Sequence, residues 1–194
     1  MTVLLIAGSP SAPSRSAVLL DAVAARLALR EVPVERIAIR ELAAHALVLG
    51  EASHPAIQRA AEQLRRADAI VIATPVYKAA YSGVLKLFLD LMPQSALRGK
   101  SVLPLATGGS PHHMLALDYA LRPVLQSMAA RHVLPGVYAT DNQVTLQSEG
   151  AYQLQSELAQ RLDDAVEALA HEGLKLPATS GFEPVPFSRV RCSV

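Results

Sequence analysis

The sequence is almost without cysteine. Its one cysteine, Cys192, stands two residues before the last residue, which excludes an intramolecular disulfide and a thiolate metal cluster. We therefore expect no bound metal. A reducing, cytoplasmic setting fits a chain of this composition.

An excess of charge of either sign is also lacking. The 18 lysine and arginine residues against 17 aspartate and glutamate residues leave a formal net charge of +1. This charge is too small for a field that would hold nucleic acid or a membrane surface, and we expect neither as a partner. An anionic ligand would need a local site.

The apolar run at the start of the chain is too short to cross a membrane. It has no basic leader, and Gly8, Ser9 and Pro10 interrupt it, so we expect neither a signal peptide nor a membrane span. The run over 2–7 instead predicts a strand that is buried on both faces and ends at a turn.

Several sequence signatures of catalysis and nucleotide binding are missing. Neither Gly-x-Ser-x-Gly nor His-Glu-x-x-His occurs, and there is no Gly-x-Gly-x-x-Gly fingerprint or Walker loop. The sequence therefore gives no support to a nucleophilic triad, a zinc-dependent hydrolase or a P-loop enzyme.

What is present is the composition of one packed domain. Hydrophobic residues make up 51% of the 194 residues and charged residues 18%. We assign this domain to residues 1–172 and an irregular arm to residues 173–194, where Pro177, Pro184 and Pro186 stand.

Strand and helix patterns alternate along this domain. The predicted strands span 2–7, 32–39, 69–73, 101–106 and 132–139, and the predicted helices span 17–30, 54–67, 83–92, 114–130 and 151–170. Ser16 is the expected N-cap of the first helix, and residues 40–53 stay unassigned. Five strands separated by helices predict a doubly wound parallel sheet with helices on both faces.

Ligands of such sheets bind beyond the carboxyl ends of the strands, where three loops carry suitable residues. The loop over 8–16 brings Ser9, Ser14, Arg15 and Ser16 to a helix start, where a phosphate is well held, although an N-capped turn with a solvated arginine gives the same pattern. The loop over 74–83 carries Tyr77, Lys78 and Tyr81, which suit a flat ring or simply cover a helix. Thr107, Gly108 and Gly109 expose backbone donors, or form only a tight turn.

The three loops together resemble the flavin loops of the NADPH-dependent FMN reductase family, whose fold is flavodoxin-like. More narrowly, three segments resemble the reductases of alkanesulfonate two-component monooxygenase systems, namely ATPVYKAAYSG (73–83), LPLATGG (103–109) and LDYALRPVL (117–125). The resemblance covers roughly residues 1–145, and the region from residue 151 gives it little support.

The resemblance implies an FMN reductase that oxidises NADPH or NADH and supplies reduced FMN to an alkanesulfonate monooxygenase. It implies that Ser9, Ser14, Arg15 and Ser16 bind the FMN phosphate. It further implies that Pro75, Val76, Tyr77 and Lys78 border the ribityl chain and ring, and that Thr107, Gly108 and Gly109 meet the ring edge. Hydride transfer between two bound cofactors needs no catalytic base, which agrees with the missing triad.

Tyr119 lies four residues before Pro123, and a proline cannot donate to the Tyr119 carbonyl. The helix must kink or bulge there. The resembling reductases have a π-helical insertion at this tyrosine, next to the flavin and at a subunit interface, so we expect a π turn, although a plain proline kink in a core helix gives the same pattern. We also expect a homo-oligomer, a dimer or a tetramer, in which the apolar helices over 84–92 and 114–128 either form the interface or simply cover the sheet.

Three other functions stay open at this stage. A quinone or azo-dye reductase of the same fold would keep its FMN bound, a flavodoxin-like electron carrier would lack pyridine-nucleotide activity, and a nucleotide sensor would bind without turnover. Carriers of this kind are usually strongly acidic, which this chain is not.

His112 and His113 follow the Gly-Gly loop and are expected to be solvated loop residues or substrate contacts rather than metal ligands.

Overall fold

A computed structural model of the chain describes residues 1–146 and 152–176. Its main sheet has the strand order β2-β1-β3-β5-β6, and β7 pairs with the other end of β5. These strands are β1 (Val3–Ala7), β2 (Val34–Ala38), β3 (Ala69–Tyr77), β5 (Ser101–Gly108), β6 (His132–Val133) and β7 (Val137–Thr140). All of their pairings are parallel, which confirms the doubly wound, flavodoxin-like α/β fold.

The central strands are buried on both faces, and their side chains alternate between two cores. Val3 and Leu5 of β1 belong to one core, while Leu4 and Ile6 belong to the other. Neighbouring strands keep this register, since Val3 pairs with Ala69 and Ile6 with Ile72. A continuous apolar run is therefore what this position in the sheet requires.

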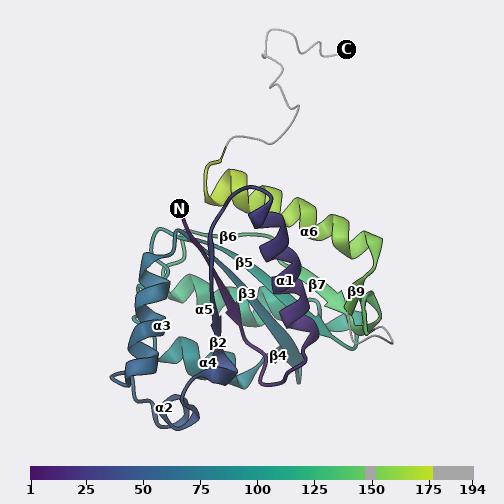
Figure 1. Ribbon diagram of the computed structural model, residues 1–194. Coiled ribbons are helices and arrows are strands. Elements are labelled where there is room, and N and C mark those ends of the chain that lie inside the picture. Colours follow the sequence, from purple (N-terminus) through teal and green to yellow (C-terminus); the bar gives the residue numbers. More distant parts are fainter. Residues whose placement is uncertain (147–151, 177–194) are drawn as a thin grey trace, which may run out of the picture.

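Helices cover both faces of the sheet (Figure 1). On one side, α1 (Arg15–Ala28) and α6 (Ser156–Ala168) lie side by side and are joined by Arg26, whose Nε donates to Asp163 at 2.6 Å. The other face is covered by α3 (Pro55–Arg66), α4 (Gly83–Asp90) and α5 (Arg122–Ser127), through residues such as Leu64, Phe88 and Leu125.

The segment over 40–53, which the sequence left unassigned, contains a 3-10 turn, η1 (Ile39–Glu41), and a short helix, α2 (Ala44–Leu49). Gly50 ends α2 with a left-handed φ of 72°, as a C-terminal glycine does. α3 then begins at Pro55, and His54 Nδ1 accepts a hydrogen bond from the Ala56 N–H at 3.2 Å. The helix predicted over 54–67 is thereby confirmed.

The fifth strand and the last helix were predicted too long. A single strand over 132–139 is wrong because Pro135, which has no N–H, and Gly136 interrupt it and leave β6 and β7 as separate pieces. The helix predicted over 151–170 is confirmed in its central part as α6, which is preceded by the strand β9 (Tyr152–Leu154) and followed by a π turn, η5 (Leu169–Gly173). β9 pairs antiparallel with β8 (Val144–Leu146) in a separate two-stranded sheet.

The helix predicted over 114–130 is divided, as the position of Pro123 requires. A 3-10 turn, η2 (Pro111–His113), precedes a π turn, η3 (Leu117–Leu121), which leads into α5. The Arg122 N–H donates to the Leu117 carbonyl five residues back. This confirms the expected bulge at Tyr119 and shows that Pro123 is accommodated one residue into a new helix.

No helix within residues 1–146 and 152–176 has the length and apolar character needed to span a membrane. Most of the predicted C-terminal arm over 173–194, including Cys192, lies outside the described residues.

Candidate functional site

The three loops singled out from the sequence meet at the carboxyl edge of the sheet. They line a recess of about 220 Å³, between the ends of β1, β3, β5 and β7. The residues that line it are Ser9, Ser11, Pro13, Ser14, Arg15, Pro75, Val76, Tyr77, Thr107, Gly108, Gly109, Asp141 and Tyr152. We call the part around Ser9, Ser14, Arg15 and Asp141 the arginine end, and the part around Thr107, Gly108 and Gly109 the glycine end.

The arginine end contains the start of α1, which lies two residues earlier than predicted. The helix begins at Arg15, so its N-cap is Ser14 and the assignment of Ser16 as N-cap is wrong. Ser14 forms no capping bond, because its hydroxyl is paired with that of Ser16 at 2.9 Å. Since Ser14 does not cap the first turn, the N–H groups of Arg15 and Ser16 are available to an anion, whereas the Ala17 N–H donates to the Ser14 carbonyl at 3.1 Å.

The loop after β1 is attached to the loop after β3 by buried polar groups. The Gly8 N–H donates to the Ala73 carbonyl at 2.8 Å, and the Ser82 hydroxyl donates to the Gly8 carbonyl. The Ser82 N–H in turn donates to Thr74 Oγ1 at 3.0 Å. Thr74 and Ser82 are each 1% exposed, so these bonds fix the two loops to one another away from water.

The strand β3 continues past the point where the sequence predicted a loop. The expected break at Thr74 and Pro75 is wrong, because Pro75 still pairs with Thr107 of β5 and the strand ends only at Tyr77. On the other side the β1 ladder ends at Ala73, so the missing N–H of Pro75 breaks no strand pairing there.

After Tyr77 the chain turns sharply into β4 (Ala80–Tyr81), which pairs antiparallel with β3. The two turn residues, Lys78 and Ala79, both have positive φ values, 51° and 64°. This is the geometry of a type I′ hairpin, which asparagine and glycine normally occupy. The backbone of the hairpin is therefore strained beside the recess.

The glycine end is shaped by what lies behind Gly108. A Cβ atom on Gly108 would stand 2.5 Å from the hydroxyl oxygen of Tyr138, so the β5 backbone and this side chain pack without room for a methyl group. The Tyr138 hydroxyl donates to the Ser110 carbonyl at 2.6 Å. Burial, and then the charge of Asp141, raise the pKa of Tyr138, which keeps the hydroxyl protonated as a donor.

Arg15 is held from the far side of the recess. Its Nε donates to the Val144 carbonyl at 3.1 Å, and its Nη1 lies 3.7 Å from Asp141 Oδ2. The first contact orients the guanidinium, whereas the second is longer than a hydrogen bond. Arg15 therefore presents positive charge in the recess beside a carboxylate.

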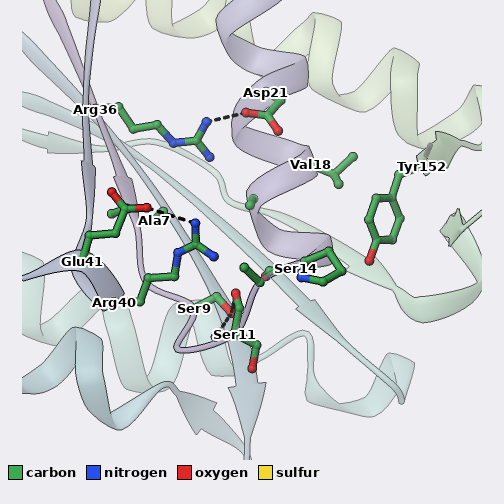
Figure 2. A pocket seen from close by; sticks show the side chains of 14 residues that line it. Ala7, Ser9, Ser11, Ser14, Val18, Asp21, Arg36, Arg40, Glu41 and Tyr152 are labelled. Carbon is green, nitrogen blue, oxygen red and sulfur yellow. Dashed lines mark hydrogen bonds and ion pairs between the residues drawn. The ribbon is translucent and has the colours of Figure 1, made fainter. Parts of the chain in front are cut away.

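A larger cavity of about 610 Å³ adjoins the recess on the β2 side. The two share Ser9, Ser11, Pro13, Ser14 and Tyr152. Figure 2 shows Arg36 and Arg40 in this second cavity, paired with Asp21 at 2.5 Å and Glu41 at 3.0 Å. The charges of its arginines are thus already balanced by neighbouring carboxylates.

Nine of the predicted site residues line the recess, and two do not. Ser9, Ser14, Arg15, Pro75, Val76, Tyr77, Thr107, Gly108 and Gly109 line it. Ser16 is buried in the first turn of α1, and Lys78 is exposed at the tip of the hairpin. Ser16 contacts the site indirectly, through the bond of its hydroxyl to that of Ser14, and Lys78 does not line the recess.

Tyr119 and the two histidines lie outside the recess. Tyr119 is 80% exposed on the π turn η3. His112 and His113 form most of η2, and within residues 1–146 and 152–176 no cluster of three or more potential metal ligands is found.

The sequence reasoning missed three residues that shape the site, Asp141, Tyr138 and Tyr152. Asp141 follows β7, so the rule that selected the other loops, residues just beyond the carboxyl ends of strands, selects it too. Tyr138 and Tyr152 carry no such signal, because one stands within a predicted strand and the other within a predicted helix.

Comparison with known proteins places this geometry in context. The profile of the NADPH-dependent FMN reductase family matches residues 1–145. The FMN reductase (NADPH) of Escherichia coli K12 is 47% identical over 167 residues, which cover 86% of this chain and 87% of that protein.

Two solved structures extend the comparison. An NADH:FMN oxidoreductase in its apo form superposes with a TM-score of 0.79 at 40% identity, covering 94% of this chain and 91% of that one. A flavodoxin from the Archaea has a TM-score of 0.59 at 12% identity, covering 89% and 98%, and this similarity shows the shared fold alone.

Proposed function

We propose a function from one premise: the chain belongs to the NADPH-dependent FMN reductase family. It is accordingly an oxidoreductase that uses FMN and a reduced pyridine nucleotide. Beyond this, we propose that it releases reduced FMN as a diffusible product to an FMNH2-dependent alkanesulfonate monooxygenase of the same cytoplasm.

One observation carries the assignment of the FMN site, namely the composition of the recess. An uncapped helix start, serine hydroxyls and one guanidinium stand at the arginine end, and bare backbone stands at the glycine end. These are the donors that a phosphate and the edge of a heterocycle require. The recess and the adjoining cavity together have the volume expected of small-molecule sites.

In this proposal Ser9, Ser14, Arg15 and the first turn of α1 hold the phosphate, with Ser16 supporting Ser14. Pro75, Val76 and Tyr77 border the ring, and the backbone of Thr107, Gly108 and Gly109 meets its edge. When bound, FMN accepts a hydride from the nicotinamide. The residues of the chain position the two molecules, and no acid or base from the protein is needed.

The alkanesulfonate partner is supported by three sequence segments, those over 73–83, 103–109 and 117–125. The last of them contains the π turn η3, which resembles the feature expected at Tyr119 in reductases of that system. Tyr119 is proposed as the residue of this turn that acts in flavin transfer.

A homo-oligomer, a dimer or a tetramer, is part of the same proposal. Met114, Leu115 and Tyr119 are 57%, 53% and 80% exposed on the segment that carries the π turn. Apolar and aromatic side chains gathered in this way are typical of a contact between subunits.

The test is steady-state oxidation of NADPH and of NADH by the apoprotein, with and without added FMN, followed anaerobically for free reduced flavin. We expect oxidation to depend on added FMN and reduced flavin to appear in solution. In a second reaction, opened to oxygen and supplied with an alkanesulfonate, we expect added alkanesulfonate monooxygenase to oxidise the sulfonate with this reduced flavin. FMN that stays bound through turnover, with oxidation only when a quinone or dye is present, would overturn the proposal. Binding without any oxidation would overturn it as well.

A further inference from the structure

We infer that Asp141 weakens the binding of the FMN phosphate by competing with it for Arg15, so that this carboxylate sets how readily the flavin leaves. The inference rests on the proposed FMN site and adds a residue that controls affinity. It concerns the phosphate contact at the arginine end of the recess.

The position of Arg15 is fixed without Asp141. Its Nε donates to the Val144 carbonyl at 3.1 Å, which fixes the guanidinium in place. Within residues 1–146 and 152–176, its two terminal nitrogens form no hydrogen bond, and the ion pair of Nη1 with Asp141 Oδ2 is 3.7 Å long. Arg15 is thus oriented and still has donors for a phosphate.

The contact between Arg15 and Asp141 is one that a ligand can replace. Its distance exceeds that of a hydrogen bond, and the two side chains are 42% and 45% exposed, so water screens the pair. A phosphate, with more negative charge and more acceptor oxygens than a carboxylate, would take the free donors of Arg15. Asp141 would then face the phosphate as a like charge.

The charge balance of the recess makes this repulsion matter. Arg15 and Asp141 are the charged side chains among its lining residues within the described part of the chain, and they cancel. A dianionic phosphate therefore meets a site with no net positive side-chain charge. Coulomb's law, at the separations of a few ångströms and the partial screening of such a site, gives about a tenfold effect on affinity.

Asp141 keeps its place by bonds that do not use its carboxylate. It is the first residue of the 3-10 turn η4 (Asp141–Gln143), which a capping box closes. The Thr140 N–H donates to Gln143 Oε1 at 3.0 Å, and Arg161 Nη2 donates to the same oxygen at 3.3 Å. The substitution Asp141→Asn therefore preserves the turn and removes only the charge.

The consequence for function is a site that binds FMN less tightly than its donors allow. An enzyme that delivers reduced flavin to another protein must release it in every turnover, and a carboxylate opposed to the phosphate favours release.

The test measures dissociation constants of FMN and of riboflavin for the apoprotein, from the quenching of flavin fluorescence. For Asp141→Asn we expect FMN to bind about tenfold more tightly and riboflavin, which lacks the phosphate, to be unchanged. Added salt should shrink the gain. In the double variant with Arg15→Gln the gain should be smaller, because the competition for the arginine is lost while the repulsion between Asp141 and the phosphate remains.

The matched control is Asp163→Asn on α6, which removes the same charge from an ion pair with Arg26 of α1. An equal gain in Asp163→Asn would overturn the inference, since the effect would be one of net charge. Weaker binding of both flavins by Asp141→Asn would also overturn it, because Asp141 would then be holding the ribityl hydroxyls. Unchanged FMN binding would do the same.

These binding constants are obtained without any pyridine nucleotide. The proposed function, in contrast, fails if NADPH oxidation yields no free reduced flavin. The two failures are therefore distinguishable, because one is read from FMN binding and the other from the fate of the product.

Discussion

The arginine end and the glycine end of the recess differ in the groups that form their surfaces, which are side chains at one end and backbone at the other. At the arginine end the functional groups are partly exposed side chains, such as Arg15, and they are positioned by contacts with distant segments. At the glycine end the surface is the backbone of β5, buried up to Gly108 and backed by Tyr138.

Because of this difference, substitutions at the two ends should act differently on FMN affinity and on the stability of the fold. The Arg15 and Asp141 side chains at the arginine end can be removed with little effect on the fold, because they are 42% and 45% exposed to water. At the glycine end the space is filled to van der Waals contact, so even a methyl group forces the strand or Tyr138 to move. Ligand binding should therefore be adjustable at one end and tied to folding at the other.

The strongest test of this contrast is Gly108→Ala, whose Cβ would overlap the Tyr138 hydroxyl. We expect a loss of about 3 kcal/mol in the free energy of unfolding, with FMN binding impaired as well. Urea denaturation and flavin titration measure the two effects.

Two variants show whether the overlap is the cause. Gly109→Ala places its Cβ 3.7 Å from Asp141 Oδ2, an ordinary contact, and should cost far less. Adding Tyr138→Phe to Gly108→Ala removes the overlapping oxygen and should restore part of the stability. A double variant no more stable than Gly108→Ala would contradict the explanation.

How much of this could be predicted from the sequence differs between the parts of the molecule. The order of strands and helices was predictable, because runs such as the one over 2–7 must be buried on both faces. The continuation of β3 through Pro75 was not, since it depends on pairing with Thr107 across the sheet. The position of Asp141 just after β7 could have been selected by the rule used for the other loops, but its contact with Arg15 is non-local and was not predictable.

The next expected effect concerns the buried junction between the loop after β1 and the loop after β3. Ser82→Ala removes the hydroxyl that donates to the Gly8 carbonyl and accepts from the Leu85 N–H at 3.3 Å, as the N-cap of α4. Since the group left unpaired is buried, we expect a loss of about 2 kcal/mol in the free energy of unfolding.

The matched control is Ser127→Ala, whose exposed hydroxyl donates to the Val124 carbonyl. This substitution should lower the free energy of unfolding by at most about 0.5 kcal/mol. Equal losses in the two variants would show that the junction adds nothing.

At the arginine end, Arg15→Gln should change binding and leave stability alone. We expect FMN to bind about tenfold more weakly, or about 1.4 kcal/mol, with riboflavin unchanged, because a charge-assisted contact to phosphate is lost. Arg36→Gln, in the adjoining cavity and already paired with Asp21, serves as the control and should leave the FMN affinity unchanged. The contrast between the ends fails if Arg15→Gln lowers the unfolding free energy as much as Gly108→Ala does.

The smallest expected effect lies in the strained hairpin beside the glycine end. Ala79 has a φ of 64°, which glycine adopts without steric cost, so Ala79→Gly should raise the unfolding free energy by about 0.5 kcal/mol after the larger entropy of the unfolded chain is included. Ala129→Gly, at the same φ of 64° but away from the recess, should give a similar gain. FMN affinity should change less than about twofold in both variants, since neither alanine lines the recess. If only Ala79→Gly weakened FMN binding, the strain itself would be needed to place Pro75, Val76 and Tyr77, and the coupling between fold and binding would extend beyond β5 into the hairpin.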